Sequence, residues 1–245
     1  MKEALGEGRI RIDELWIAEG KTSPRTKEIL CMAESKGIPT QFKPPPILDR
    51  LLPQTAHQGI VALAEGFSYV DLNALADRSL KASDQALIVA ADHITDEGNL
   101  GALIRTAVFF KAQGLVLPKD RSASVTERVK KRSSGAYVHL PVARVVNLGR
   151  ALDVLNSKGF WIIGTAGESR ETIFQFDWNR NVVLILGSEE RGISPSIKKR
   201  CHQMVCIPAY GQVSALNVSV AAGVTLSEII RQRTLTGGAR SQQEP

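Results

Sequence analysis

The sequence has little cysteine and no long apolar run. Only three of its 245 residues are cysteines, Cys31, Cys201 and Cys206, too few and too odd in number for a disulfide framework. No stretch approaches the roughly 18–20 consecutive apolar residues that a membrane-spanning helix needs. Met1, Lys2 and Glu3 lead into a charged segment and not into the apolar core of a signal peptide. These absences exclude membrane-embedded and disulfide-stapled proteins and favour a reducing, cytoplasmic setting.

Aromatic residues are also scarce, at 5% of the chain, so base stacking cannot spread over a wide surface. The net charge of +6 is uneven. Residues 1–80 hold 10 Lys and Arg against 11 Asp and Glu, whereas residues 81–245 hold 21 against 14. Six basic residues gather within one short segment: Lys119, Arg121, Arg128, Lys130, Lys131 and Arg132. Such a cluster fits an RNA or DNA contact or a solvated helix face, and charge alone leaves both open.

The first part of the chain, residues 1–67, is typical of a small α/β unit. Strand-like runs at 10–17, 38–42 and 58–64 surround a helix over 23–36, for which Ser23 is a suitable N-cap and Pro24 a suitable first residue. We expect Pro44, Pro45 and Pro46 to block regular structure, with a helical turn following at 47–52. Residues 68–84 are polar and weakly helical, which predicts a linker.

Residues 85–235 alternate strands and helices. Apolar runs at 86–91, 114–117, 138–142, 160–163, 182–186 and 204–207 predict buried strands. Helical patterns lie between them at 100–112, 122–134 and 147–158, and again at 215–231. This order is typical of an α/β fold with a mostly parallel, helix-covered sheet. Residues 236–245 predict a polar tail.

The usual cofactor motifs are missing from this α/β part. No Gly-x-Gly-x-x-Gly follows a strand. Residues 187–192 have glycines at P-loop spacing, but the lysine that would reach a phosphate is absent. Cys201, His202 and Cys206 have no second ligand pair, so we expect structural thiols and no metal. His57, His93 and His139 are isolated in the sequence, and no catalytic triad stands out.

Three polar clusters follow predicted strands, at the edge where open α/β sheets bind ligands. The first spans residues 96–107, where Asn99 can cap a helix and Arg105 lies further along it. The second is a Gly-bracketed acidic loop at 186–193, which a simple turn explains equally well. The third spans 207–220, where Asn217 lies among small apolar residues and would need hydrogen-bond partners if buried.

In this order, residues 99–105, 187–192 and 207–221 resemble the three motifs of the SpoU/TrmH branch of the SPOUT RNA methyltransferases. Residues 116–123 and 164–167 are similar to segments between those motifs, so the resemblance covers residues 85–233. The first unit, which ends in residues 57–62, is similar to the ribosomal-protein-L30e-like RNA-binding domain of the RlmB subgroup. That subgroup methylates the 2′-hydroxyl of a guanosine in 23S ribosomal RNA.

The resemblance implies a deep trefoil knot, S-adenosylmethionine as cofactor, and a homodimer with its site at the subunit interface. By position, it assigns the cofactor contacts to Thr165, Ala166, Gly167, Leu186, Gly187, Ile207, Pro208, Leu216 and Asn217. It assigns the catalytic group to Asn99, Arg105, Glu189 and Asn217. Because a guanidinium is a very poor base, we expect Arg105 to hold a phosphate and stabilise the charge that develops on the 2′-oxygen.

Two features depart from the family pattern. Ala215 stands where the family usually has serine, with Ser214 beside it as a partial substitute. Met1 lies almost inside the first helix, where relatives carry a strand or turn, so we expect a clipped domain or an upstream start. The alternative functions are 2′-O-methylation of transfer RNA or of an antibiotic-contact site in ribosomal RNA, and non-catalytic RNA binding or ribosome assembly.

Overall fold

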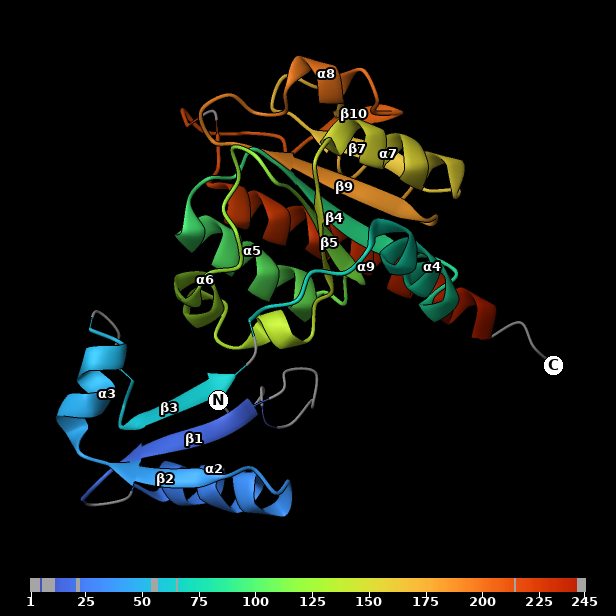
Figure 1. Cartoon of the computed structure of the whole chain (residues 1–245). Helices are drawn as coiled ribbons and strands as arrows, with labels where there is room; N and C mark the ends of the chain where they lie inside the picture. Colours follow the sequence, from blue (N-terminus) through green and yellow to red (C-terminus); the bar gives the residue numbers. More distant parts are fainter. Residues whose placement is uncertain are drawn as a thin grey trace. The chain divides into compact units, whose positions relative to one another are not determined.

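The computed structural model describes residues 5, 12–20, 23–53, 57–64, 66–213 and 215–241. The chain divides into an N-terminal unit, Met1–Ser68, and a C-terminal unit, Tyr69–Pro245. Each contains its own sheet (Figure 1). The start of the chain, where we expected a first helix close to Met1, lies mostly outside the described residues, although Leu5 is buried.

The N-terminal unit is built on a three-stranded sheet with β1 (Ile12–Ala18) in the centre. β2 (Thr40–Lys43) runs parallel to β1, and β3 (Ile60–Ala64) runs antiparallel to it. α2 (Pro24–Ser35) packs its buried face, including Ile29 and Ala33, against Leu15 and Ile17 of β1. The predicted cap is confirmed, since the Ser23 hydroxyl accepts from the backbone N–H of Thr26 at 3.1 Å.

The three consecutive prolines lie differently from our expectation. Pro45 and Pro46 are the first two residues of α3 (Pro45–Leu51), and Pro44 is its N-cap. The first helical positions have no N–H partner within the helix, and the fixed φ of proline suits them. The expectation that these prolines block regular structure was therefore wrong, because it treated every proline as if it lay inside a helix.

The C-terminal unit contains a seven-stranded sheet in its described part, with the order β6-β5-β4-β9-β7-β10-β8. Every strand pair is parallel. The strands are β4 (Leu87–Asp92), β5 (Gly114–Pro118), β6 (Val142–Val145), β7 (Trp161–Thr165), β8 (Glu171–Thr172), β9 (Val182–Gly187) and β10 (Gln203–Cys206). All six residues of β4 are buried, as expected of a strand covered on both faces. The predicted α/β architecture is confirmed.

Helices cover both faces of this sheet (Figure 1). α4 (Leu72–Ala82), α7 (Leu148–Ser157) and α8 (Pro195–Lys198) enclose a core with Ile88 and Val183. On the other face, α5 (Glu97–Phe109) packs along α9 (Val218–Ser241) and α6 (Glu127–Arg132). Among the described residues, no helix has the length and apolar character needed to cross a membrane.

The structure corrects four sequence-based boundaries in this unit. Residues 68–84 are not a simple linker, because α4 buries Leu75 and Ala76 in the core. β6 begins at Val142, while Ala136–Val138 forms a turn of 3-10 helix (η1) where we expected a strand. The expected helix over 122–134 shortens to α6. α9 extends to Ser241 into the expected tail, and residues 242–245 lie outside the described part.

Candidate active site

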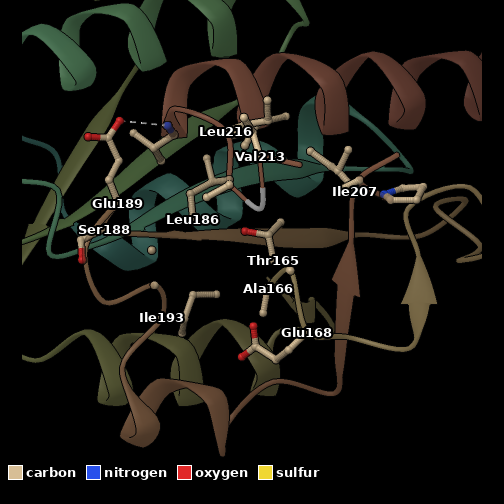
Figure 2. A pocket seen from close by; sticks show the side chains of 18 of the residues that line it. Thr165, Ala166, Glu168, Leu186, Ser188, Glu189, Ile193, Ile207, Val213 and Leu216 are labelled. Atoms are coloured by element: carbon tan, nitrogen blue, oxygen red, sulfur yellow. Dashed lines mark hydrogen bonds between the residues drawn. The ribbon is translucent and has the colours of Figure 1, made fainter. Parts of the chain in front are cut away.

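A cavity of about 620 Å³ opens beside the C-terminal ends of β7, β9 and β10. Figure 2 shows Thr165, Leu186, Ile207 and Leu216 around it. Eight of the nine residues expected to contact the cofactor line this cavity: Thr165, Ala166, Gly167, Leu186, Gly187, Ile207, Pro208 and Leu216. The ninth, Asn217, reaches the cavity wall through a hydrogen bond to Glu189. The walls combine aliphatic side chains with loop backbone.

The acidic loop after β9 is folded tightly on itself. Ser188 and Gly192 exchange backbone hydrogen bonds of 3.2 and 2.8 Å. A Cβ at Gly187 would overlap the backbone of Gly192 and Ile193, and Gly192 has a φ of +63° that suits glycine. These glycines therefore have a packing role, which lets the loop turn sharply and present Glu189 at the cavity wall.

Asn217 is the centre of a hydrogen-bond cluster that joins all three motifs. Its Nδ2 donates to Asn99 Oδ1 at 2.9 Å and to Glu189 Oε1 at 2.5 Å. Its Oδ1 accepts from the backbone N–H and the hydroxyl of Ser219, at 2.9 and 2.6 Å. Glu189 Oε1 also accepts from the backbone N–H of Val218 at 3.3 Å. The cluster thus fixes the start of α9 against the loop after β9 and the start of α5.

Arg105 lies apart from this cluster. It follows Asn99 by six residues on α5, which places it roughly one and two-thirds turns and about 9 Å along the helix. Its guanidinium is exposed and donates to the hydroxyl of Ser134 at 3.0 Å. Four residues were expected to form the catalytic group. Within a single chain, Asn99, Glu189 and Asn217 lie together, whereas Arg105 lies further along α5 and bonds Ser134.

A second cavity, of about 500 Å³, lies next to the first. Both cavities are lined by Ser188, Glu189, Arg191, Gly192 and Val218. The loop after β9 is thus shared between the two cavities. Asn99 and Arg121 line the second cavity only.

Charge near the first cavity is partly neutralised by an ion pair. Lys198 Nζ lies 2.5 Å from Glu168 Oε1, and both residues line the cavity. The hydrogen bond from Lys198 is the main reason that the pKa of Glu168 is lowered. Nearby, burial raises the pKa of the Cys201 thiol to about 11, with a further contribution from the charge of Asp92. The thiol therefore stays protonated at neutral pH.

The six basic residues separate into paired and exposed groups. Lys130 is not a free surface cation, because its Nζ lies 2.6 Å from Glu127 and 5.7 Å from the centre of the Tyr137 ring. Arg128 lies 3.8 Å from Glu97. The others are exposed and form no ion pair with a described residue: Lys119, Arg121, Lys131 and Arg132.

Sequence reasoning missed a histidine in the second cavity. His93, which we described as isolated, lies with its Nδ1 2.6 Å from Oδ1 of Asp92 and lines that cavity. The other carboxylate oxygen of Asp92 accepts from the backbone N–H of Ser194 at 2.7 Å. The available signal was an Asp-His pair at the carboxyl end of a buried strand, where ligand sites gather.

Comparison with known proteins places this site in a family. The pattern of the SpoU rRNA Methylase family matches residues 86–227, and the pattern described as RNA 2'-O ribose methyltransferase substrate binding matches residues 2–70. The 23S rRNA (guanosine-2'-O-)-methyltransferase RlmB of Pseudomonas aeruginosa is 38% identical over 224 residues, which are 91% of this chain and 90% of the relative. RlmB of Escherichia coli is 35% identical over 91% of this chain and 92% of the relative.

A solved structure supports the same relationship. The SpoU methyltransferase AviRb from Streptomyces viridochromogenes, in complex with AdoMet, is similar at a TM-score of 0.80 and 27% identity. The match covers 95% of this chain and 87% of AviRb. The family pattern spans more than half of the chain, and it includes Asn99, Glu189 and Asn217, which the structure joins by hydrogen bonds. The chain therefore belongs to the SpoU rRNA methylase family.

Proposed function

We propose that this protein transfers a methyl group from S-adenosylmethionine to the ribose 2′-hydroxyl of a guanosine in 23S ribosomal RNA. The observation that carries the proposal is that two cavities share the loop bearing Glu189, which is hydrogen-bonded to Asn217. A methyl transfer needs two reactants held side by side. The names of the P. aeruginosa and E. coli relatives supply the ribosomal RNA and the guanosine.

The first cavity suits S-adenosylmethionine. Leu186, Ile207 and Leu216 offer apolar surface for a purine ring, and the carboxylate of Glu189 balances a positively charged ligand. When bound, S-adenosylmethionine supplies a methyl group on a positively charged sulfur. The residues of this chain then have to orient the ribose 2′-hydroxyl, remove the proton of this hydroxyl and exclude water.

We further propose that the protein acts as a homodimer. Arg105 is exposed on α5, and Phe109, four residues further on the same helical face, is 78% exposed. Val220 on α9 and Val213 before it are also exposed, at 50% and 75%. Exposed apolar side chains on the two packed helices α5 and α9, with an exposed arginine on α5, are expected of a surface that a second copy covers. Arg105 of the partner subunit would then complete the cluster around Asn217.

The finer features of the fold belong to the same proposal. A deep trefoil knot in the C-terminal unit, which the resemblance of the three motifs implies, is supported by the match of the SpoU family pattern to residues 86–227. An L30e-like role for the N-terminal unit in binding RNA is supported by the substrate-binding pattern over residues 2–70. The phosphates of the RNA would contact four exposed cations: Lys119, Arg121, Lys131 and Arg132. The proposed setting of the reaction is the cytoplasm.

The test is nucleotide-resolution mapping of 2′-O-methyl groups on unmodified 23S ribosomal RNA, with labelled S-adenosylmethionine and Arg105→Ala as the comparison. We expect one modified guanosine with the wild type and a fall of at least about 100-fold in rate with the variant, since electrostatic stabilisation of the developing charge is removed. Equal rates would refute the role of Arg105. If only transfer RNA were modified, the substrate would be transfer RNA and not 23S ribosomal RNA. Tight RNA binding without S-adenosylmethionine binding would indicate a non-catalytic protein.

A further inference from the structure

The loop between β5 and α6, residues 119–126, carries a cation that faces the second cavity. Arg121 lines this cavity and is exposed. Its φ of +53° is a left-handed conformation that a residue with a side chain rarely adopts. Backbone strain of this kind persists only where the surrounding structure holds it. The contacts that hold this loop therefore decide where the Arg121 guanidinium lies.

Tyr69 holds the end of the loop. Its hydroxyl accepts from the backbone N–H of Val125 at 2.9 Å. Val125 is buried, and a buried N–H needs a partner, which here is a side chain. Tyr69 is itself fixed in place, because the N–H of the next residue, Val70, donates to Val142 O at 2.9 Å, and Val70 pairs with Ala143 of β6. The first residues of the C-terminal unit thus lie along the edge of its sheet.

Arg144 of β6 holds the start of the loop. Its Nη2 donates to the carbonyl oxygen of Lys119 at 3.1 Å. Its guanidinium carbon lies 5.4 Å from the centre of the Tyr69 ring, within the range of a cation–π contact. Its Nε is buried without a hydrogen-bond partner among the described residues. Burial of an unpaired donor is unfavourable, so the contacts to Lys119 and Tyr69, and not the packing of β6, explain an arginine at this position.

The two residues hold the chain on both sides of Arg121. Arg144 binds the residue two positions before it, and Tyr69 binds the residue four positions after it. Between these contacts, the N–H of Ala123 donates to Ile94 O at 2.8 Å, and Ile94 also lines the second cavity. The short segment that contains Arg121 is therefore fixed at both ends and lies beside the cavity.

We propose that Tyr69 and Arg144 are positioning residues, which hold the loop after β5 so that Arg121 binds a phosphate of the RNA beside the second cavity. This inference rests on the proposed function and adds two residues that lie outside the three motifs. Neither residue lines either cavity, so both act through Arg121. The place of the loop matters because a guanidinium binds phosphate oxygens through donors in a rigid, planar fork.

The test is a double-variant cycle on RNA binding. Tyr69→Phe keeps the ring beside Arg144 and removes the hydroxyl that accepts from Val125. Binding of labelled 23S ribosomal RNA is measured across a salt series for the wild type, Tyr69→Phe, Arg121→Gln and the double variant. We expect Tyr69→Phe to weaken binding by about 3- to 10-fold, because a charge-assisted contact is lost in part. The slope of log affinity against log salt should fall by up to about 1.

The double variant separates positioning from a general structural role. In the Arg121→Gln background, Tyr69→Phe should not weaken RNA binding further, because its effect passes through Arg121. In methyl transfer, Tyr69→Phe should raise the KM for RNA and leave kcat unchanged, since the phosphate contact is equally strong in the ground state and the transition state. A loss of folded protein would instead lower kcat.

Arg144→Met is the second variant, because it removes the donor to Lys119 and keeps an apolar side chain against the ring. We expect it to weaken RNA binding when Arg121 is present and to have no effect in the Arg121→Gln background. Hydrogen exchange of the amides of residues 119–126 should be faster in both variants. Binding of S-adenosylmethionine, measured by calorimetry, should match that of the wild type, because neither residue lines the first cavity.

The outcomes distinguish this inference from the proposed function. Wild-type RNA affinity and salt slope in both Tyr69→Phe and Arg144→Met overturn the positioning role. So does an equal loss of RNA affinity with and without Arg121, since the residue then acts independently of Arg121. A wild type that binds no S-adenosylmethionine and methylates no RNA overturns the proposed function, while the cycle, which needs RNA binding alone, still decides whether Tyr69 and Arg144 position Arg121.

Discussion

At the level of single residues, the side-chain amide of Asn217 both caps a helix and links two other side chains. Its oxygen accepts from the N–H of Ser219 at the start of α9, as a helix cap does. Its nitrogen donates to Asn99 and Glu189. Aspartate could cap the helix equally well, but it cannot donate. The choice of asparagine is therefore explained by the cluster and not by the helix.

This reasoning predicts a rescue between positions 217 and 189. Asn217→Asp puts two carboxylates in contact, whereas the double variant Asn217→Asp with Glu189→Gln exchanges amide and carboxylate and restores a donor–acceptor pair. We expect the double variant to be more stable than Asn217→Asp alone by about 1 kcal/mol, a typical coupling between contacting residues. Urea unfolding of the wild type, both single variants and the double variant measures it. A double variant no more stable than Asn217→Asp would contradict the pairing.

At the scale of the element, α6 shows how a basic helix divides its charges. Val129 is buried, and Gly101 of α5 lies so close that a Cβ there would overlap the Arg132 side chain. Lys130 is turned to Glu127 and Tyr137. Lys131 and Arg132 remain exposed. Neighbouring lysines therefore face different surroundings because successive helical positions are rotated by about 100°.

The salt dependence of RNA binding should follow this division. Neutralising both Lys131 and Arg132 with glutamine is expected to reduce the slope of log affinity against log salt by about 2, near one unit for each phosphate that the variant no longer neutralises. Lys130→Gln is the matched control, and its slope should stay close to that of the wild type. The measurement is filter binding of labelled ribosomal RNA across a salt series. A Lys130→Gln slope that falls by about 1, as much as each of the two exposed cations is expected to contribute, would refute the assignment.

Some helices and strands could be predicted from the sequence, whereas several contacts between them could not. Buried strands such as β4 and β9 follow from short apolar runs, and the Ser23 cap follows from local chemistry. The Asp92–His93 contact could not be predicted, because it depends on a left-handed φ at His93 that side-chain pattern does not encode. Likewise, the pairing of Lys130 depends on where Tyr137 lies after a turn. Motif spacing identified the loops around the cavity, whereas their mutual contacts required the fold.

At the level of the complete protein, a single chain does not bring all four residues of the expected catalytic group together. The cluster of Asn99, Glu189 and Asn217 lies at the cavities, while Arg105 points elsewhere on α5 and bonds Ser134. A rigid helix cannot bring both Asn99 and Arg105 to one point, because they lie on different faces of it. If Arg105 takes part in the reaction, a second copy has to supply it. Homodimers with two-fold symmetry are the commonest oligomers and would form two such sites.

Mixing two inactive variants tests this arrangement. Arg105→Ala removes the arginine and Asn217→Ala disrupts the cluster, so each homodimer should be inactive. In a mixed dimer, the subunit with Arg105→Ala keeps its own Asn217 and receives Arg105 from its partner, which leaves one intact site. After unfolding and refolding together in equal amounts, we expect roughly a quarter of the wild-type methyl-transfer rate, since random pairing makes about half of the dimers mixed. Each variant refolded alone is the control. If the mixture were no more active than the separate variants while its subunits had demonstrably exchanged, Arg105 would act within its own chain, and α5 would have to rearrange when RNA binds.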